Sequence, residues 1–331
     1  MPNSMKQDHI SVERSTQKQV ITRDGVTLSV TDTGDTGKPA LLFVHGLTQS
    51  SFAFRAQFLS ERLRARFRLV AFDLRGHGRS QGAFGAVAAD GRALPLLEPE
   101  HYHLPGDRAG TSRLWANDIE AVIEGLGLHA PAIIGWSYGG VVACDYMATH
   151  GGLGAASKVM LIASTPGCLP PGAEGIGGDQ VFMPEVPAAV FRTIDIDPMQ
   201  QPAVASTAEA VISGLTDFVA LTLRDTVSDR PPASRDDILS AMTYNLRMPP
   251  AARQAALFRE IDHRPFLSGL PDADKARIRV LCGTGDAVMQ SVKMAAEFQR
   301  CGLNVDILSD EGHSFFLRNP APFEERLVGW G

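Results

Sequence analysis

Residues 130–150, which read APAIIGWSYGGVVACDYMATH, place a serine at the centre of a Gly-x-Ser-x-Gly pattern. About one chain in ten of this length contains that pattern by chance, so the pattern alone is weak. Its surroundings carry more information, because APAIIG (130–135) predicts a strand and YGGVVACDYMATH (138–150) predicts a helix. A serine on a tight turn between a strand and a helix is typical of a nucleophile elbow.

The tight turn explains the glycines on either side of Ser137. Such a turn brings the residues two before and two after the serine into contact. A Cβ at Gly135 or Gly139 would therefore clash, whereas Trp136 and Tyr138 point away. The serine hydroxyl would then lie near the N-terminus of the helix, whose free N–H groups favour a developing oxyanion. We expect Ser137 to be a nucleophile and the backbone N–H of Tyr138 to be one oxyanion donor.

A serine hydroxyl is a poor nucleophile until a base takes its proton. Of the nine histidines, His313 in SDEGHSFFLRNP lies on a loop after a late predicted strand and before the last predicted helix, where such a base is expected. The base also needs an orienting carboxylate, and Asp286 in LCGTGDAVMQ follows another predicted strand. Open parallel sheets bind their ligands at the carboxyl ends of their strands, which is where Asp286 is expected to lie. We expect Asp286 to orient His313, with Asp306 and Asp310 as weaker rivals.

The second oxyanion donor is expected from the loop VHGLTQSS, which follows the first buried strand. His45 and Gly46 make a tight exit from that strand, and Leu47 would supply the N–H group. We interpret His45 as a structural residue that holds the loop rather than as the base.

Short apolar runs alternate with helical patterns along most of the chain. A β-hairpin is predicted over residues 18–33, with its turn at Asp24-Gly25. Strands buried on both faces are predicted at ALLFV (40–44) and FRLVAF (67–72). Further strands are predicted at APAIIG (130–135), SKVMLIA (157–163), RIRVLCG (277–283) and LNVDIL (303–308). Helical patterns lie between the strands, including SFAFRAQFLSERLRA (51–65). The alternation favours a mostly parallel sheet that is covered by helices on both faces.

Residues 166–275 break this alternation. After a Pro/Gly-rich entry they contain helical stretches near 205–226, 235–247 and 250–260. We expect a core formed by residues 1–165 and 276–331 and a helical cap, or lid, over residues 166–275. Residues 81–111 form a second, smaller insertion within the core.

The composition excludes several function classes. With 44% hydrophobic and 21% charged residues the 331-residue chain can bury a sizeable core, and its net charge of −6 argues against nucleic acid as a partner. The polar N-terminus lacks the apolar stretch of a signal peptide, and no apolar run is long enough to cross a membrane. The four cysteines show no CxxC spacing, so we expect a reduced, cytoplasmic protein without disulfides.

We also expect neither a cofactor nor a metal ion. No Gly-x-Gly-x-x-Gly pattern follows the first strand, as dinucleotide binding would require. His101 and His103 in EHYH are spaced as metal ligands sometimes are, but no third ligand accompanies them.

Five motifs together resemble the α/β-hydrolase superfamily. They are HGL at 45–47, DLRGHGRS at 73–80, GWSYGG at 135–140, GTGD at 283–286 and DEGH at 310–313, in the family's order. The resemblance covers about residues 18–165 and 277–330. Within the superfamily, the core looks most like small carboxylesterases and the cofactor-free haloperoxidases or perhydrolases. The resemblance implies a mostly parallel eight-stranded sheet flanked by helices, with a helical cap inserted after the sixth strand.

The leading hypothesis is a serine hydrolase that cleaves a small-molecule carboxylic ester or lactone through an acyl-enzyme on Ser137. Alternatively, the same site performs C–C bond hydrolysis, acyl transfer or perhydrolysis, and a third hypothesis is a non-catalytic ligand receptor. A serine rather than an aspartate at the elbow argues against dehalogenation and epoxide opening. The substrate pocket is expected to include Trp136, Phe182, Met183 and Met242. The sequence leaves the substrate and the oligomeric state open.

Overall fold

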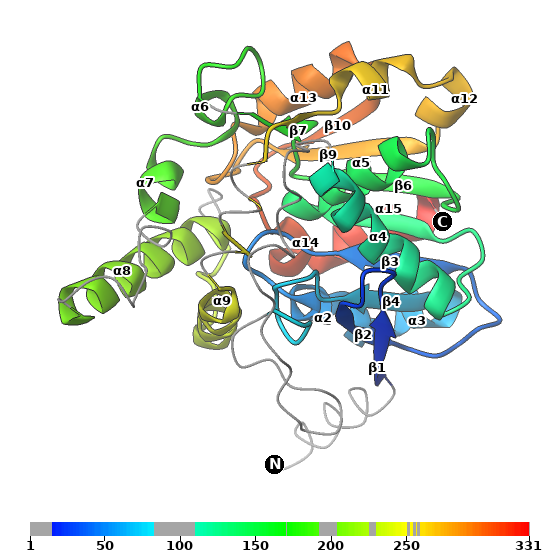
Figure 1. Cartoon of the computed structure of the whole chain (residues 1–331), viewed down its shortest axis with the longest axis horizontal. Coiled ribbons are helices and arrows are strands. Elements are labelled where there is room, and N and C mark those ends of the chain that lie inside the picture. The colour runs from blue at the N-terminus through cyan, green and yellow to red at the C-terminus, as the bar shows by residue number, and fades with distance from the viewer. Residues whose placement is uncertain are drawn as a thin grey trace.

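The structure is a computed structural model of the chain. It describes residues 15–82, 110–169, 171–191, 204–224, 230–249, 252–253, 256 and 259–330. Within these residues eight strands form one sheet in the order β1-β2-β4-β3-β5-β6-β9-β10 (Figure 1). His101, His103 and most of the predicted insertion over residues 81–111 lie outside the described residues.

The strands of this sheet are five or six residues long. They are β1 (Thr16–Ile21), β2 (Thr27–Asp32), β3 (Ala40–Val44), β4 (Arg68–Phe72), β5 (Ala132–Trp136), β6 (Lys158–Ile162), β9 (Ile278–Gly283) and β10 (Asn304–Leu308). The helices that accompany them are η1 (Ser51–Phe54), α2 (Arg55–Leu59), α3 (Glu61–Arg66), α4 (Gly110–Gly125), α5 (Tyr138–Thr149), α13 (Ser291–Arg300), α14 (Phe315–Arg318) and α15 (Pro320–Trp330). Between β6 and β9 lie β7 (Gly167–Cys168), α6 (Gly178–Val181), α7 (Glu185–Phe191), α8 (Val204–Thr222), α9 (Arg235–Arg247), β8 (Ile261–Asp262), α11 (Arg264–Gly269) and α12 (Asp272–Lys275).

The sheet is mostly parallel. The strands from β4 to β10 in the sheet order pair in parallel, while β2 pairs antiparallel with both β1 and β4. The β1–β2 hairpin turns at Asp24-Gly25, where Gly25 has a φ of +86° and its N–H donates to the Thr22 carbonyl (3.0 Å). Glycine adopts a positive φ without steric cost. The predicted mostly parallel, eight-stranded sheet is confirmed.

Alternate residues of the buried strands face two separate cores. In β3, Leu42 and Val44 belong to one apolar cluster, and Leu41 and Phe43 belong to the other. Because successive side chains of a strand point to opposite faces, a strand covered on both sides is apolar throughout. Helices α4, α5 and α13 contribute to the first cluster, and α3, α14 and α15 contribute to the second. Figure 1 shows α4 and α5 in front of the sheet.

The helical pattern over residues 51–65 does not form one continuous helix. It forms η1, α2 and α3, and the break between α2 and α3 falls at Ser60, which has extended dihedral angles (φ −69°, ψ 111°) and ends α2. The Oγ of Ser60 then accepts a hydrogen bond from the N–H of Leu63 (3.3 Å) and caps α3. A serine that bonds to the backbone in this way favours a helix start over a helix interior.

The segment between β6 and β9 is largely helical, as the sequence predicts. Helices α8 and α9 match two of the predicted stretches, while most of the third, residues 250–260, lies outside the described residues. The sequence pattern did not predict the antiparallel pair β7–β8, which joins Gly167 to Asp262 and brings the two ends of the segment together. None of the described helices is long and apolar enough to cross a bilayer.

Candidate active site

Ser137 occupies the turn between β5 and α5. The strand ends at Trp136 and the helix begins at Tyr138, and between them Ser137 has a φ of +53° and a ψ of −120°. A positive φ is strained for a residue that has a Cβ, so the surrounding contacts must hold the serine in this conformation.

Hydrogen bonds to the backbone of Ser137 hold the strained turn. Its N–H donates to the carbonyl of Ile162 at the end of β6 (2.8 Å). Its carbonyl accepts from the N–H of Gly140 (2.9 Å) and from the hydroxyl of Ser164 (2.8 Å). Sequence reasoning missed Ser164, because this role depends on a contact between two neighbouring strand ends.

Glycine is required on both sides of the serine. A Cβ on Gly135 would lie 2.5 Å from the carbonyl oxygen of Gly139. A Cβ on Gly139 would lie 2.2 Å from the carbonyl oxygen of Val44, at the end of β3. At both positions the neighbouring backbone lies so close that only glycine fits. At Gly135 the neighbour belongs to the turn itself, whereas at Gly139 it belongs to β3.

His313 and Asp286 form a buried hydrogen-bonded pair. His313 Nδ1 lies 2.9 Å from Asp286 Oδ2, and both side chains are almost fully buried. Asp286 also accepts hydrogen bonds from the N–H groups of Val288 (2.8 Å) and Met289 (2.9 Å) and from the hydroxyl of Ser291 (2.8 Å). These bonds hold the carboxylate in one orientation. With Nδ1 bound to the carboxylate, Nε2 is the ring nitrogen that can accept a proton.

The rival carboxylates contact other groups. Asp306 lies 3.2 Å from Arg279 and 3.6 Å from Arg326, and Asp310 is exposed. The structure thus pairs His313 with Asp286.

Trp136 connects the serine turn to the histidine loop. Its Nε1–H donates to the backbone carbonyl of His313 (2.9 Å), and the two ring centroids are 5.6 Å apart. The indole also packs edge-on against Phe316 at 5.0 Å. Because Trp136 directly precedes Ser137, this hydrogen bond fixes the position of the histidine loop relative to the serine turn.

The loop after β3 lies against Ser137. A Cβ on Gly46 would lie 3.1 Å from the Cβ of Ser137, so the glycine lets this loop approach closely. Tyr138 is the first residue of α5, where a backbone N–H has no acceptor within the helix. Leu47 and Tyr138 both line the cavity that contains Ser137. The structure therefore places the two residues expected to donate to an oxyanion around the same space.

His45 is fully buried, and both of its ring nitrogens bond to backbone groups. Its Nε2 accepts from the N–H of Leu74 (3.0 Å), so the proton is on Nδ1, which donates to the carbonyl of Gly46 (2.7 Å). Burial lowers the pKa of His45 to about 4, so the ring is neutral near pH 7. This arrangement matches the interpretation of His45 as a structural residue of the loop.

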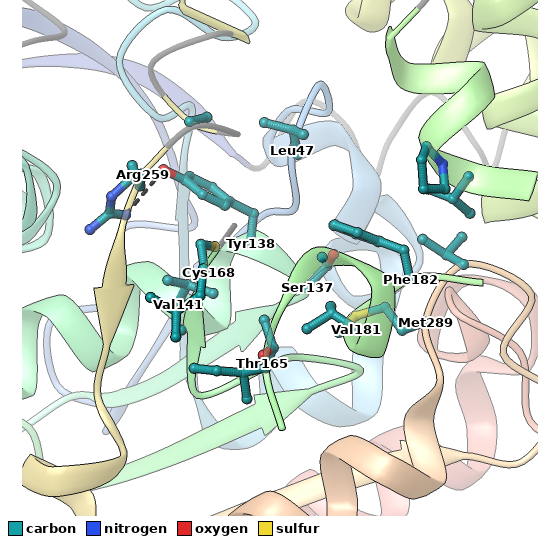
Figure 2. A pocket seen from close by; sticks show the side chains of 18 of the residues that line it. Leu47, Ser137, Tyr138, Val141, Thr165, Cys168, Val181, Phe182, Arg259 and Met289 are labelled. Carbon is teal, nitrogen blue, oxygen red and sulfur yellow. Dashed lines mark hydrogen bonds between the residues drawn. The ribbon is translucent and has the colours of Figure 1, made fainter. Parts of the chain in front are cut away.

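Ser137 lines a cavity of about 610 Å³. Figure 2 shows Phe182 and Met289 on one side of Ser137 and Tyr138 on the other. The walls are largely apolar, and most of their side chains come from α5 and from the segment between β6 and β9; among them are Val141, Ile176, Val181, Val186, Phe218 and Ala256.

Of the four residues expected in the substrate pocket, Phe182 lines this cavity, whereas Trp136, Met183 and Met242 do not. Trp136 is buried and packs against His313 and Phe316. Met183 packs on the apolar cluster around Val288, and Met242 packs on the cluster between α8 and α9. Periodicity in the sequence cannot distinguish these neighbouring packing positions from the cavity wall.

A buried polar cluster adjoins the cavity through Tyr138 and Arg259, which line it. The Tyr138 hydroxyl accepts a hydrogen bond from Arg259 Nη1 (3.1 Å), which Figure 2 shows, and Arg259 Nη2 donates to Asp145 (2.6 Å). His263 Nε2 lies 2.8 Å from the same carboxylate oxygen. Burial raises the pKa of Tyr138 well above its usual value, so the phenol stays protonated. No sequence motif marks this cluster, because Tyr138 and Asp145 lie more than a hundred residues before Arg259 and His263.

Comparison with known proteins agrees with this geometry. Residues 41–326 match the Alpha/beta hydrolase family. The chain is 33% identical over 147 residues to the bifunctional esterase/perhydrolase of Acinetobacter calcoaceticus, which covers 44% of this chain and 45% of that protein. It is 31% identical over 148 residues to the non-heme chloroperoxidase of Burkholderia pyrrocinia, again with 44% and 45% covered.

The chain spans less than half the length of these curated relatives. Among solved structures, an esterase from a Rhodococcus species superposes on 95% of this chain and 98% of its own, with a TM-score of 0.71 and 25% sequence identity. The likeness in fold therefore extends over nearly the whole chain, while the pairwise matches to these curated relatives cover 44% of it.

Proposed function

Because the chain belongs to the alpha/beta hydrolase family, we propose that it is a serine hydrolase that cleaves a carboxylic ester or lactone through an acyl-enzyme on Ser137. The observation that carries the proposal is the buried hydrogen bond between His313 and Asp286 (2.9 Å), which Trp136 holds beside a strained serine turn. A serine kept at a positive φ on the wall of a cavity is expected where function requires the strain.

In the proposed reaction Ser137 Oγ attacks the ester carbonyl carbon, and His313 Nε2 accepts the hydroxyl proton. The bond to the leaving oxygen then breaks, and His313 returns the proton to that oxygen, which gives a free alcohol and an acyl-serine. Water attacks the acyl carbon while His313 takes one of its protons. The acid is released when this proton is returned to Ser137. Asp286 keeps the proton of His313 on Nδ1 and stabilises the imidazolium.

The backbone N–H groups of Leu47 and Tyr138 are the proposed oxyanion donors. The carbonyl oxygen becomes negatively charged in both tetrahedral intermediates, and N–H groups already oriented by the fold stabilise this charge without reorganising. The N-terminus of α5 adds its partial positive charge at the same point.

We propose that residues 166–275 act as a cap that forms much of the substrate cavity. Phe182 and Phe218 come from this segment and lie in the cavity wall. A largely apolar wall favours a neutral small-molecule ester or lactone, because burying an unpaired charge there would be costly.

The second candidate activity is perhydrolysis at the same site. Two relatives, at 33% and 31% identity, are named for perhydrolase and chloroperoxidase activity, which favours this candidate over acyl transfer or C–C cleavage. Hydrogen peroxide would then replace water as the attacking molecule and would release a peroxy acid. Measuring peroxy acid and carboxylic acid from one ester, with and without peroxide, separates the two activities.

The direct test of the proposed function is the rate of p-nitrophenyl ester hydrolysis by the Ser137→Ala variant. We expect kcat to fall by at least about a thousandfold, because the nucleophile is lost while binding remains. Ser309→Ala, which changes a surface serine, is the matched control and should keep the wild-type rate. Turnover by Ser137→Ala at the wild-type rate would show that the nucleophile is assigned wrongly.

A further inference from the structure

Thr48 has an unfavourable backbone conformation one residue after a proposed oxyanion donor. The loop turns over residues 46–49, where the N–H of Gln49 donates to the carbonyl of Gly46 (3.3 Å). Thr48 is the third residue of this turn and has a φ of +61°. Turns with a positive φ at that position normally use glycine or asparagine, and a β-branched residue there is a steric outlier. Some contact must therefore hold Thr48 in place.

That contact comes from α9, in the segment between β6 and β9. The Nδ2 group of Asn245 donates to the hydroxyl of Thr48 (2.8 Å), and both residues are buried. The two residues are 197 positions apart in the sequence, so the bond joins the inserted segment to the core.

Arg253 fixes the orientation of the Asn245 amide. Arg253 Nη1 donates to Asn245 Oδ1 (2.9 Å), and Arg253 Nη2 donates to the backbone carbonyl of Asn245. Its Nε also donates to the carbonyl of Met248 (3.2 Å). Because the amide oxygen of Asn245 accepts a hydrogen bond from the Arg253 guanidinium, its amide nitrogen must face Thr48. The donor to Thr48 is thus itself held by two hydrogen bonds from a buried side chain.

We propose that Asn245 is a positioning residue that keeps the oxyanion loop in its active conformation. The inference rests on the proposed function and adds a role for the inserted segment beyond forming the cavity wall. Without the hydrogen bond from Asn245, Thr48 relaxes to a negative φ, and the peptide between Leu47 and Thr48 rotates. Leu47, whose N–H is the proposed donor, then moves relative to Ser137.

This role predicts a specific kinetic effect. Neither Asn245 nor Thr48 lines the cavity, so the walls that bind the substrate stay in place when their bond is lost. The oxyanion exists only during the reaction, so a displaced donor lowers kcat and leaves KM nearly unchanged. A residue that only docked the inserted segment would instead raise KM when removed, because the cavity would open.

The experiment compares Asn245→Ala in two backgrounds with a p-nitrophenyl ester as substrate. In the wild-type background we expect kcat to fall roughly tenfold, less than the hundredfold or greater loss typical of deleting an oxyanion donor outright, with KM within about twofold. In the Thr48→Gly background the same change should lower kcat less than about twofold, because glycine adopts the positive φ without help. Thr243→Ala, on the exposed face of α9, is the matched control and should leave both constants unchanged.

Thr48→Val provides a second, independent measurement if Asn245→Ala folds poorly. Valine keeps the shape of threonine but cannot accept the hydrogen bond, so this variant should show the same loss of kcat. A kcat that Asn245→Ala and Thr48→Val leave unchanged would overturn the proposal. An equal loss of kcat for Asn245→Ala in both backgrounds would also overturn it. So would a rise in KM with kcat unchanged.

These outcomes are distinct from a failure of the proposed function. If Ser137→Ala keeps full turnover, the proposed function and this inference both fail. If Ser137→Ala is inactive but glycine at position 48 does not reduce the effect of Asn245→Ala, only the inference fails.

Discussion

His45 and His77 are buried beside each other, with ring centroids 5.1 Å apart. Burial lowers the pKa of His45 to about 4 and that of His77 to about 3, from a usual value of 6.5. In the unfolded chain both rings titrate near the usual value. Below about pH 6.5 the unfolded chain therefore binds more protons than the folded chain does, and the folded state loses stability as the pH falls toward 4.

We predict that the free energy of unfolding decreases from pH 7 to pH 5, with a slope that approaches about 1.4 kcal/mol per pH unit for each histidine. Urea unfolding at several pH values measures this slope. His77→Asn removes one of the two groups and keeps a donor for the Arg75 carbonyl, so it should reduce the histidine part of the slope by about half. His129→Asn, at an exposed position, is the control. If His77→Asn leaves the slope unchanged, the burial of His77 does not contribute to the loss of stability at low pH.

At the scale of residues, local motifs were enough to predict where Ser137, Asp286 and His313 lie. Each is in a short pattern that follows an apolar run, and a tight turn needs glycine at fixed positions. Asn245 and Arg259 could not be predicted, because each acts through a side chain that is far away in the sequence. No local pattern marks a residue whose partner is chosen by the tertiary fold.

The junction of β5 and α5 depends on backbone packing against β3. Gly139→Ala would place a Cβ 2.2 Å from the carbonyl oxygen of Val44, so the N-terminus of α5 must move away from β3. We predict a loss of about 1–3 kcal/mol in the free energy of unfolding. We also predict a fall of at least about tenfold in kcat/KM, because the turn that presents Ser137 shifts.

Gly329→Ala is the matched control for this prediction. Gly329 lies in α15, and a Cβ there would meet no atom within 4 Å. Alanine should leave kcat/KM unchanged and slightly raise stability, because it favours the helix. Thermal unfolding and ester turnover of the two variants measure both effects. Equal behaviour of the two variants would mean that the approach of α5 to β3 is not as close as the structure indicates.

At the scale of elements, the spacing of apolar residues along the sequence predicted the long helices and the fully buried strands well. The runs that form β3, β4, β5, β6 and β9 were recognised because a strand covered on both faces is largely apolar. The edge strand β10 is mostly exposed or half-buried, and it was recognised from its shorter apolar pattern. The spacing did not predict breaks that depend on a single side chain, such as the end of α2 and the start of α3 at Ser60. It also failed for β7 and β8, since two residues each are too few to show a period.

At the scale of the whole molecule, the candidate site lies at one edge of the sheet. Ser137 follows β5, Asp286 follows β9 and His313 comes after β10, and these strands are parallel. The carboxyl ends of parallel strands meet at the same edge, which explains how residues from distant motifs come together. The cavity above this edge was predicted poorly, because the inserted segment packs on it through contacts that have no repeating pattern.

The central claim is that an acyl group is carried on Ser137. The most direct measurement is the intact mass of the protein after treatment with a fluorophosphonate probe, followed by peptide mapping. We predict a single adduct on the peptide that contains Ser137, no adduct on the Ser137→Ala variant and full labelling of Ser309→Ala. An adduct on a different residue, or ester turnover that continues after Ser137 is fully labelled, would contradict the account.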